Sequence, residues 1–88
     1  MKTIWKYVLA VTDEQQVRIP ANSRFLSAQV QNGQICIWCL VRAEEEPVLN
    51  TFLIAGTGNP LPKSIEYQYE YLDTVQLDNF VWHIFRKK

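Results

Sequence analysis

Apolar residues along the chain fall into short runs, and the composition of these runs favours β-strands. Residues 3–11 (TIWKYVLAV) are dense in β-branched and aromatic side chains, which predicts a strand that packs on both faces. A polar turn follows, and residues 17–20 (VRIP) predict a second, shorter strand. Because Pro20 has no backbone N–H to donate, we expect it to end this strand or to place it at a sheet edge.

Asn32 and Gly33 mark a tight turn between two further apolar runs, residues 24–30 and 34–42. Asn-Gly is the strongest short signal for a β-hairpin, because both central positions of the turn require positive φ. The second run is apolar throughout residues 35–41, so the alternation of a one-sided strand fails. This pattern predicts a central strand that is covered on both faces.

The second half of the chain continues in the same way after a charged loop. Residues 48–55 predict a strand that stops at two closely spaced glycines, and residues 80–85 (FVWHIF) predict the last strand before a basic, solvated tail at 86–88. Between them, the first half of residues 64–77 alternates with period two, which favours a strand over a helix. The side chains expected on one face there are Ile65, Tyr67, Tyr69 and Tyr71.

Six or seven short strands at this spacing predict an all-β fold, a small antiparallel sandwich or barrel-like domain with little or no helix. The chain has 88 residues, which leaves room for a single domain spanning residues 1–88. Apolar residues make up 48% of it, and a domain this small cannot bury all of them. We therefore expect aromatic side chains on the surface or in the interface of a homo-oligomer.

The charge pattern excludes several classes of protein. Nine basic and nine acidic residues cancel, and the only basic block is at residues 86–88, so the pattern does not favour binding to a DNA or RNA backbone. Apolar runs are too short for a membrane span or a signal peptide. These features predict a cytoplasmic protein without a membrane association.

Cys36 and Cys39 form a C-x-x-C sequence, which in other settings binds zinc or exchanges disulfides. On a strand, however, three residues at about 3.3 Å each separate the two Cα atoms by roughly 10 Å, and the side chains point to opposite faces. A zinc site also needs further ligands, and the chain has no third Cys and one His. We expect two reduced core thiols, no metal site and no cofactor.

His83 is the only histidine, so any general base of the histidine type must be this residue. No serine or threonine stands in a recognisable nucleophile motif. We favour a packed or interface role for His83 over a catalytic one. Asp73 is the least explained acid, since it stands in an apolar stretch, and a turn or bulge explains it as well as function does.

Residues 56–60 (GTGNP) form the most distinctive loop of the sequence. A phosphate-binding P-loop or a dinucleotide fingerprint requires a following helix, which Pro60 and Pro62 disfavour. The loop still offers backbone N–H groups, together with the side chains of Thr57 and Asn59, as a nest for an anion. Both a structural corner and a contact with a ligand or partner therefore remain open.

Five ordered segments carry a resemblance to a known family: KTIWKYVL, TDEQQVRIP, CIWCLV, GTGNP and FVWHIF. Together they resemble small uncharacterised proteins encoded by bacteriophages and prophages. Asn59 stands where members of that family favour His, and KSIEYQYEY is longer than expected, which weakens the case for a metal or acid–base role of the loop. The resemblance brings no established activity.

The phage context implies a non-enzymatic binding protein, an anti-defence factor in the cytoplasm of the infected bacterium. Its partner would be a host defence protein or a cyclic nucleotide signal. The alternatives are a structural component of the virion or its assembly, and a small hydrolase that uses His83. The candidate contact residues are Trp5, Arg24, Gly56, Thr57, Gly58, Asn59, Tyr69, Trp82 and His83.

Overall fold

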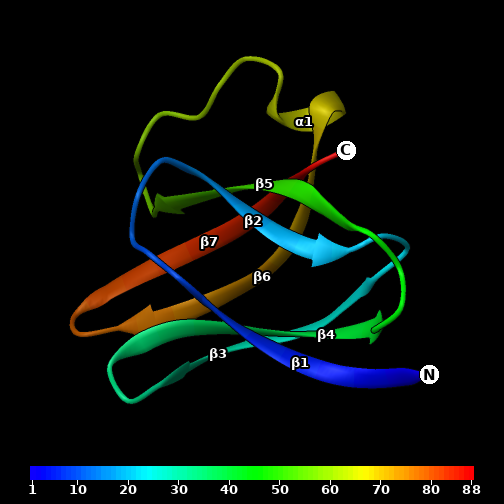
Figure 1. The fold of residues 1–88 in the computed structure, drawn as a ribbon. Coiled ribbons are helices and arrows are strands. Elements are labelled where there is room, and N and C mark those ends of the chain that lie inside the picture. The colour runs from blue at the N-terminus through cyan, green and yellow to red at the C-terminus, as the bar shows by residue number, and fades with distance from the viewer.

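The computed structural model describes all of residues 1–88 and contains seven strands and one helical turn (Figure 1). The strands are β1 (Lys2–Leu9), β2 (Glu14–Pro20), β3 (Arg24–Gln31), β4 (Gln34–Arg42), β5 (Pro47–Gly56), β6 (Tyr69–Leu77) and β7 (Phe80–Lys87). The helix α1 (Ile65–Gln68) lies between β5 and β6, and no helix of the protein is long or apolar enough to cross a membrane. The predicted all-β class is confirmed.

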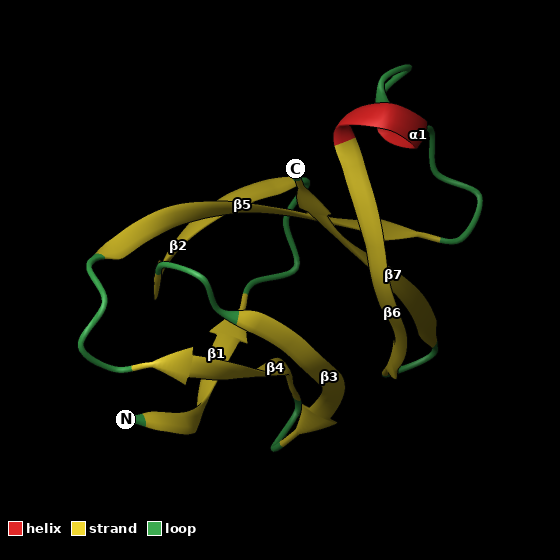
Figure 2. Ribbon diagram, turned by 90° about the vertical axis from the view of Figure 1, so that its right-hand side faces the viewer, coloured by secondary structure: helices red, strands yellow, loops and turns green.

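The strands form two antiparallel sheets that pack as a sandwich (Figure 2). The three-stranded sheet has the order β1-β4-β3, and the four-stranded sheet has the order β2-β5-β7-β6. Their inner faces make the core. Its largest fully buried side chains are Ile19, Ile35, Ile37, Phe52 and Ile84.

The predicted hairpin and the central position of the strand over residues 34–42 are both confirmed, but the expected cover on both of its faces is not, since Trp38 and Leu40 on the outer face are only half-buried. Asn32 and Gly33 have φ of 53° and 72°, and they join β3 to β4 directly above the Gln31–Gln34 pair. β4 is the middle strand of its sheet, and Ile37 is fully buried within it. A second two-residue turn, in which Asp78 has φ of 58°, joins β6 to β7.

The expectation that the first strand packs on both faces was wrong. β1 is an edge strand, and only the face that carries Tyr7 and Leu9 meets the core. Ile4 and Val8 point to the other side and are 55% and 47% exposed, since no further layer covers the outer face of the three-stranded sheet. β-branched and aromatic residues there reflect strand propensity rather than two-sided burial. β2 is an edge strand as well, as Pro20 indicated.

The expectation of a strand over residues 65–71 was wrong for residues 65–68. β7 ends at Lys87, which pairs with Tyr69, so no strand remains beside the preceding residues. They instead form one helical turn, in which the carbonyl of Ser64 accepts hydrogen bonds from the N–H groups of Tyr67 and Gln68. Tyr67 and Tyr69 consequently do not share a face: the first is 68% exposed and the second is buried.

The last strand is longer than its apolar residues indicate. Arg86 and Lys87, which the sequence placed in a solvated tail, belong to β7. Arg86 donates from Nε and Nη2 to the carboxylate of Glu70 on β6, at 3.0 and 2.7 Å. The pairing partner, not apolar composition, extends the strand.

Asp73 links the two sheets along one side of the sandwich. β6 has a bulge between Tyr71 and Asp73, and β3 has one between Phe25 and Ser27. The Oδ2 atom of Asp73 accepts a hydrogen bond from the backbone N–H of Ala28 at 3.0 Å. A bulge therefore explains this acid, and its carboxylate satisfies an N–H on the free edge of β3.

Candidate functional site

His83 lies on the outer face of the four-stranded sheet, on the side opposite the core. It pairs with Ala55 of β5 and Thr74 of β6, while its neighbour Ile84 points inward and is fully buried. Both nitrogens of its ring meet threonine hydroxyls. Nε2 lies 2.7 Å from Oγ1 of Thr57, and Nδ1 lies 3.0 Å from Oγ1 of Thr74.

The hydrogen bonds of His83 continue into a chain of four side chains. The hydroxyl of Thr74 also contacts the hydroxyl of Tyr71, so the chain runs Tyr71–Thr74–His83–Thr57. In one tautomer of the neutral ring, Nδ1 donates to Thr74 and Nε2 accepts from Thr57; in the other tautomer both directions reverse. Either way, one donor and one acceptor of the ring are matched, and the imidazole is fixed in orientation.

The GTGNP loop turns tightly at the end of β5. Gly58 has φ of 89°, a conformation that favours glycine, and the N–H of Asn59 donates to the carbonyl of Gly56 at 3.0 Å. The N–H of Thr57 donates to the carbonyl of Val81 at 3.2 Å. Two of the N–H groups that we expected to be available to an anion are thus bonded within the protein, and the loop is less of an anion nest than its sequence indicated.

Glycine at position 56 has a second cause, which is close packing. A Cβ atom there would lie 3.0 Å from Nδ2 of Asn59 and 3.3 Å from the ring of Trp82. The loop therefore packs directly against the indole of Trp82, which lies on the core side of β7.

The loop and the residues after it form the rim of several cavities. A small cavity of about 140 Å³ lies beneath the loop, where Gly56, Thr57, Gly58 and Asn59 meet His83 and Phe85. Beside it on the same face, a cavity of about 550 Å³ includes Tyr71 and Tyr69. On the core side of β7, at the end of the sheet, another cavity of about 470 Å³ includes Phe80 and Trp82.

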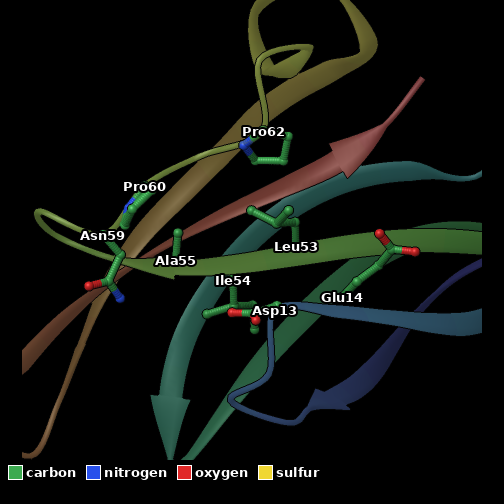
Figure 3. A pocket seen from close by; sticks show the side chains of 8 residues that line it. All are labelled: Asp13, Glu14, Leu53, Ile54, Ala55, Asn59, Pro60 and Pro62. Carbon is green, nitrogen blue, oxygen red and sulfur yellow. The ribbon is translucent and has the colours of Figure 1, made fainter.

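A further cavity of about 480 Å³ lies between the same loop and the start of β2 (Figure 3). Asn59, Pro60 and Pro62 form one wall, and Leu53 and Ala55 of β5 form the floor. Glu14 lies at the end away from Asn59, and Asp13 lies beside Ile54, so the cavity is acidic on this side.

The structure brings six of the nine predicted contact residues together. Gly56, Thr57, Gly58, Asn59, Trp82 and His83 all line cavities around the loop. The other three do not join them. Trp5 and Arg24 belong to the three-stranded sheet; Tyr69 lines only the neighbouring cavity and is 7% exposed, because it packs against Leu53 and Ala55.

Thr74 and Tyr71 are site residues that the sequence analysis missed. The signal for Thr74 was present, because a two-residue turn at Asp78 and Asn79 places Thr74 directly opposite His83 in a hairpin. Tyr71 could not be placed by the same count, since the bulge before Asp73 shifts the register.

Both cysteines are free and buried, which confirms the expectation of two core thiols. Cys39 points into the main core, and burial raises the pKa of its thiol above the ordinary value of 9.0. No group of three or more His, Cys, Asp or Glu side chains is arranged to hold a metal ion.

The fold and this site define a class of small antiparallel β-sandwich with a hollowed outer face, in which a glycine loop overhangs a hydrogen-bonded histidine. The chain belongs to the family described as Domain of unknown function (DUF7352), whose model matches residues 1–88. No curated protein and no solved structure matches the chain.

Proposed function

We propose that the protein is a non-enzymatic binding protein that acts by occupying a host protein, with the surface around the GTGNP loop, at one end of the four-stranded sheet, as its contact surface. The observation that carries this proposal is the overhanging GTGNP loop, which has cavities on several sides. Tyr71 and Phe80 line two of these cavities and are 57% and 62% exposed. Exposed aromatic rings beside a preformed concave surface are typical anchors of protein–protein interfaces.

The charge around the loop favours a protein partner over a nucleotide. The side chains that line these cavities include Asp13, Glu14 and Glu66, but no Lys or Arg. A phosphate group placed there would meet carboxylates and no cation to neutralise it. A protein surface with basic and apolar side chains fits this face better.

The resemblance to bacteriophage and prophage proteins supports the biological setting. In that setting the protein acts in the cytoplasm of an infected bacterium, and its partner is a component of a host defence system. Sequestration of a cyclic nucleotide signal is a second mode of the same anti-defence role. A thermal-shift screen against such nucleotides separates the two modes, because a ligand that binds only the folded state must raise its stability.

The test of the proposal is a comparison of variants in a partner-capture experiment. Immobilised wild-type protein is exposed to host lysate, and the captured host protein is quantified and then purified for an affinity measurement. We expect Phe80→Ala to weaken the affinity about tenfold or more, since truncating an anchor residue costs about 2 kcal/mol. Val8→Ala is the matched control, because Val8 is an exposed apolar residue of the other sheet. Equal affinities of the two variants would contradict the proposed surface.

One contact favours a second candidate function, hydrolysis with Thr57 as nucleophile. Oγ1 of Thr57 lies 2.7 Å from Nε2 of His83, which is the spacing of a nucleophile and its base, and Thr74 orients the ring from the other side. The orienting group is a hydroxyl, however, so no carboxylate stabilises the imidazolium that a base must become. If the protein hydrolyses ester or peptide substrates and both Thr57→Ala and His83→Ala abolish this activity, hydrolysis replaces binding as the proposed function.

A further inference from the structure

The three-stranded sheet carries a segregated positive charge that the neutral composition conceals. Its strands β1, β3 and β4 contain four basic residues and no Asp or Glu, whereas the other five basic residues and all nine acidic residues lie elsewhere. The four basic residues are Lys2, Lys6, Arg24 and Arg42. The sheet therefore has a formal side-chain charge of +4, and the rest of the protein has −4.

Strand pairing places three of these cations together on the outer face. Lys2 lies directly opposite Arg42, and Arg24 lies opposite Leu40, which is two residues before Arg42 on the central strand. Residues two apart on a strand point to the same side about 7 Å apart, while the intervening Val41 is fully buried in the core. Lys2, Arg24 and Arg42 thus surround one position on the sheet surface.

That position is a cavity of about 210 Å³. Lys2, Arg24 and Arg42 line it together with Asn22 and Leu40, and no carboxylate is among the lining residues. None of the three cations forms an ion pair, since the ion pairs of the protein are Met1–Glu44 and Arg86–Glu70.

The nearby acid Glu44 has its oxygens engaged elsewhere. Both accept hydrogen bonds from the amino group of Met1, at 2.7 and 2.8 Å. This bond and, to a smaller extent, the charge of Arg42 lower the pKa of Glu44. Glu44 does not line the cavity, so no carboxylate faces the three cations within it.

Like charges directly opposite each other on a sheet are destabilising, so the Lys2–Arg42 pair does not serve the fold. An anion between them would relieve that repulsion. Two guanidinium groups can each bind a phosphate through paired N–H donors, and the lysine adds a third charge. Leu40 is the apolar wall of the cavity, and the exposed Ile4 lies opposite Leu40 on the same face.

We propose that Lys2, Arg24 and Arg42 form a binding site for a phosphorylated small molecule with at least two negative charges. This site is separate from the proposed protein-binding surface, because it lies on the other sheet and shares no lining residue with the cavities of the GTGNP loop. A nucleic acid backbone fits less well, since the cations converge on one cavity, and the remaining cation, Lys6, is bonded to Gln31 at 2.8 Å.

The test is a calorimetric titration of the full-length protein with inorganic pyrophosphate at low ionic strength. We expect Arg24→Gln and Arg42→Gln each to weaken binding about tenfold, as loss of a charged phosphate contact does. Arg18→Gln is the matched control, because Arg18 is an exposed arginine of β2 on the other sheet, and its affinity should stay within about twofold of the wild type. Circular dichroism verifies that each variant is folded.

A second arm compares pyrophosphate with a nucleoside diphosphate. If the nucleotide binds more tightly than pyrophosphate and Ile4→Ala removes this gain in affinity, the ligand has an apolar or aromatic part. If the two affinities are equal, the phosphate groups are the whole ligand. Both outcomes support the site. Absence of pyrophosphate binding at millimolar concentration, or equal weakening by all three arginine variants, would overturn it. So would a stronger interaction with a single-stranded oligonucleotide that depends on Lys6 as much as on Arg24.

The two proposals fail independently. Arg24→Gln should leave capture of the host protein unchanged, and Phe80→Ala should leave pyrophosphate binding unchanged. A variant of one surface that abolished both activities would show that they are one site.

Discussion

At the scale of single residues, the polar side chains that stand out in the sequence are explained by hydrogen bonds across strands. Asp73 accepts from the N–H of Ala28 on the other sheet and from the N–H of Thr74 beside it, at 3.0 and 2.8 Å. His83 is matched at both ring nitrogens. Both side chains are thus held in place by hydrogen bonds within the protein.

Replacing Asp73 by alanine should destabilise the protein by about 1–3 kcal/mol, because the N–H of Ala28 then loses its acceptor at the junction of the two sheets. Urea denaturation measures this change in the free energy of unfolding. Glu66→Ala is the control, since Glu66 is an exposed acid with no side-chain hydrogen bond, and it should change stability by less than about 0.5 kcal/mol. Equal effects of the two substitutions would show that the bond to Ala28 contributes nothing.

At the scale of elements, the sequence predicts what local chemistry determines. The Asn32-Gly33 turn, the central strand and the edge position of β2 all follow from turn conformation, from an unbroken apolar run and from a proline. The helical turn of residues 65–68 was missed because the period-two pattern of these residues is typical of a strand. They form no strand because β7 ends at Lys87 and leaves no strand for them to pair with. Pairing between distant strands overrides local pattern here.

The same limit applies to the two sites. Thr74 follows from a hairpin count, but the contact of Thr57 with His83 requires the pairing of β5 with β7, which are not consecutive in the chain. The cluster of Lys2 with Arg42 requires β1 to pair with β4. No spacing rule along the sequence reveals either contact.

Gly33→Ala should destabilise the β3–β4 hairpin by about 1–2 kcal/mol, because alanine at φ of 72° adopts a left-handed conformation that glycine alone tolerates freely. No heavy atom lies within 4 Å of the added Cβ, so the cost is conformational and not steric. Thermal or urea denaturation measures it. Ser27→Ala, within strand β3 of the same hairpin, is the comparison, and a smaller loss for Gly33→Ala than for Ser27→Ala would contradict the assignment.

At the scale of the whole molecule, charge and burial are distributed by the two-sheet architecture and not by position in the chain. A formal net charge of zero divides into a basic outer face on one sheet and an acidic remainder. Two groups that contact the core, Tyr7 and Cys39, have a raised pKa. Burial raises the pKa of Tyr7, and the charge of Cys39 adds to the effect; burial likewise raises the pKa of Cys39.

These two pKa values predict a loss of stability at alkaline pH. A group whose pKa is higher in the folded state binds more protons there than in the unfolded state, so its contribution is complete below the unfolded pKa and declines as pH rises. The ordinary values are 9.0 for the thiol and 10.0 for the phenol, so the free energy of unfolding should fall as pH rises above about 9. Urea denaturation between pH 7 and 10.5 measures this slope.

Tyr7→Phe and Cys39→Ala separate the two contributions, since each removes one titrating group. We expect a shallower alkaline slope in both variants, whatever their stability at pH 7. A slope that is unchanged in both would assign the alkaline loss to other groups.

The bond between Asp73 and Ala28 also determines where the sandwich is free to fluctuate. Contact between the two sheets at their edges is most extensive between β3 and β6, where this charge-assisted bond fastens them. On the other side, β1 and β2 are connected by a short turn and end their sheets as edge strands. Local opening of the structure should therefore be rarest where β3 contacts β6. Backbone amide hydrogens there should exchange with solvent more slowly than those at the outer edges of β1 and β2.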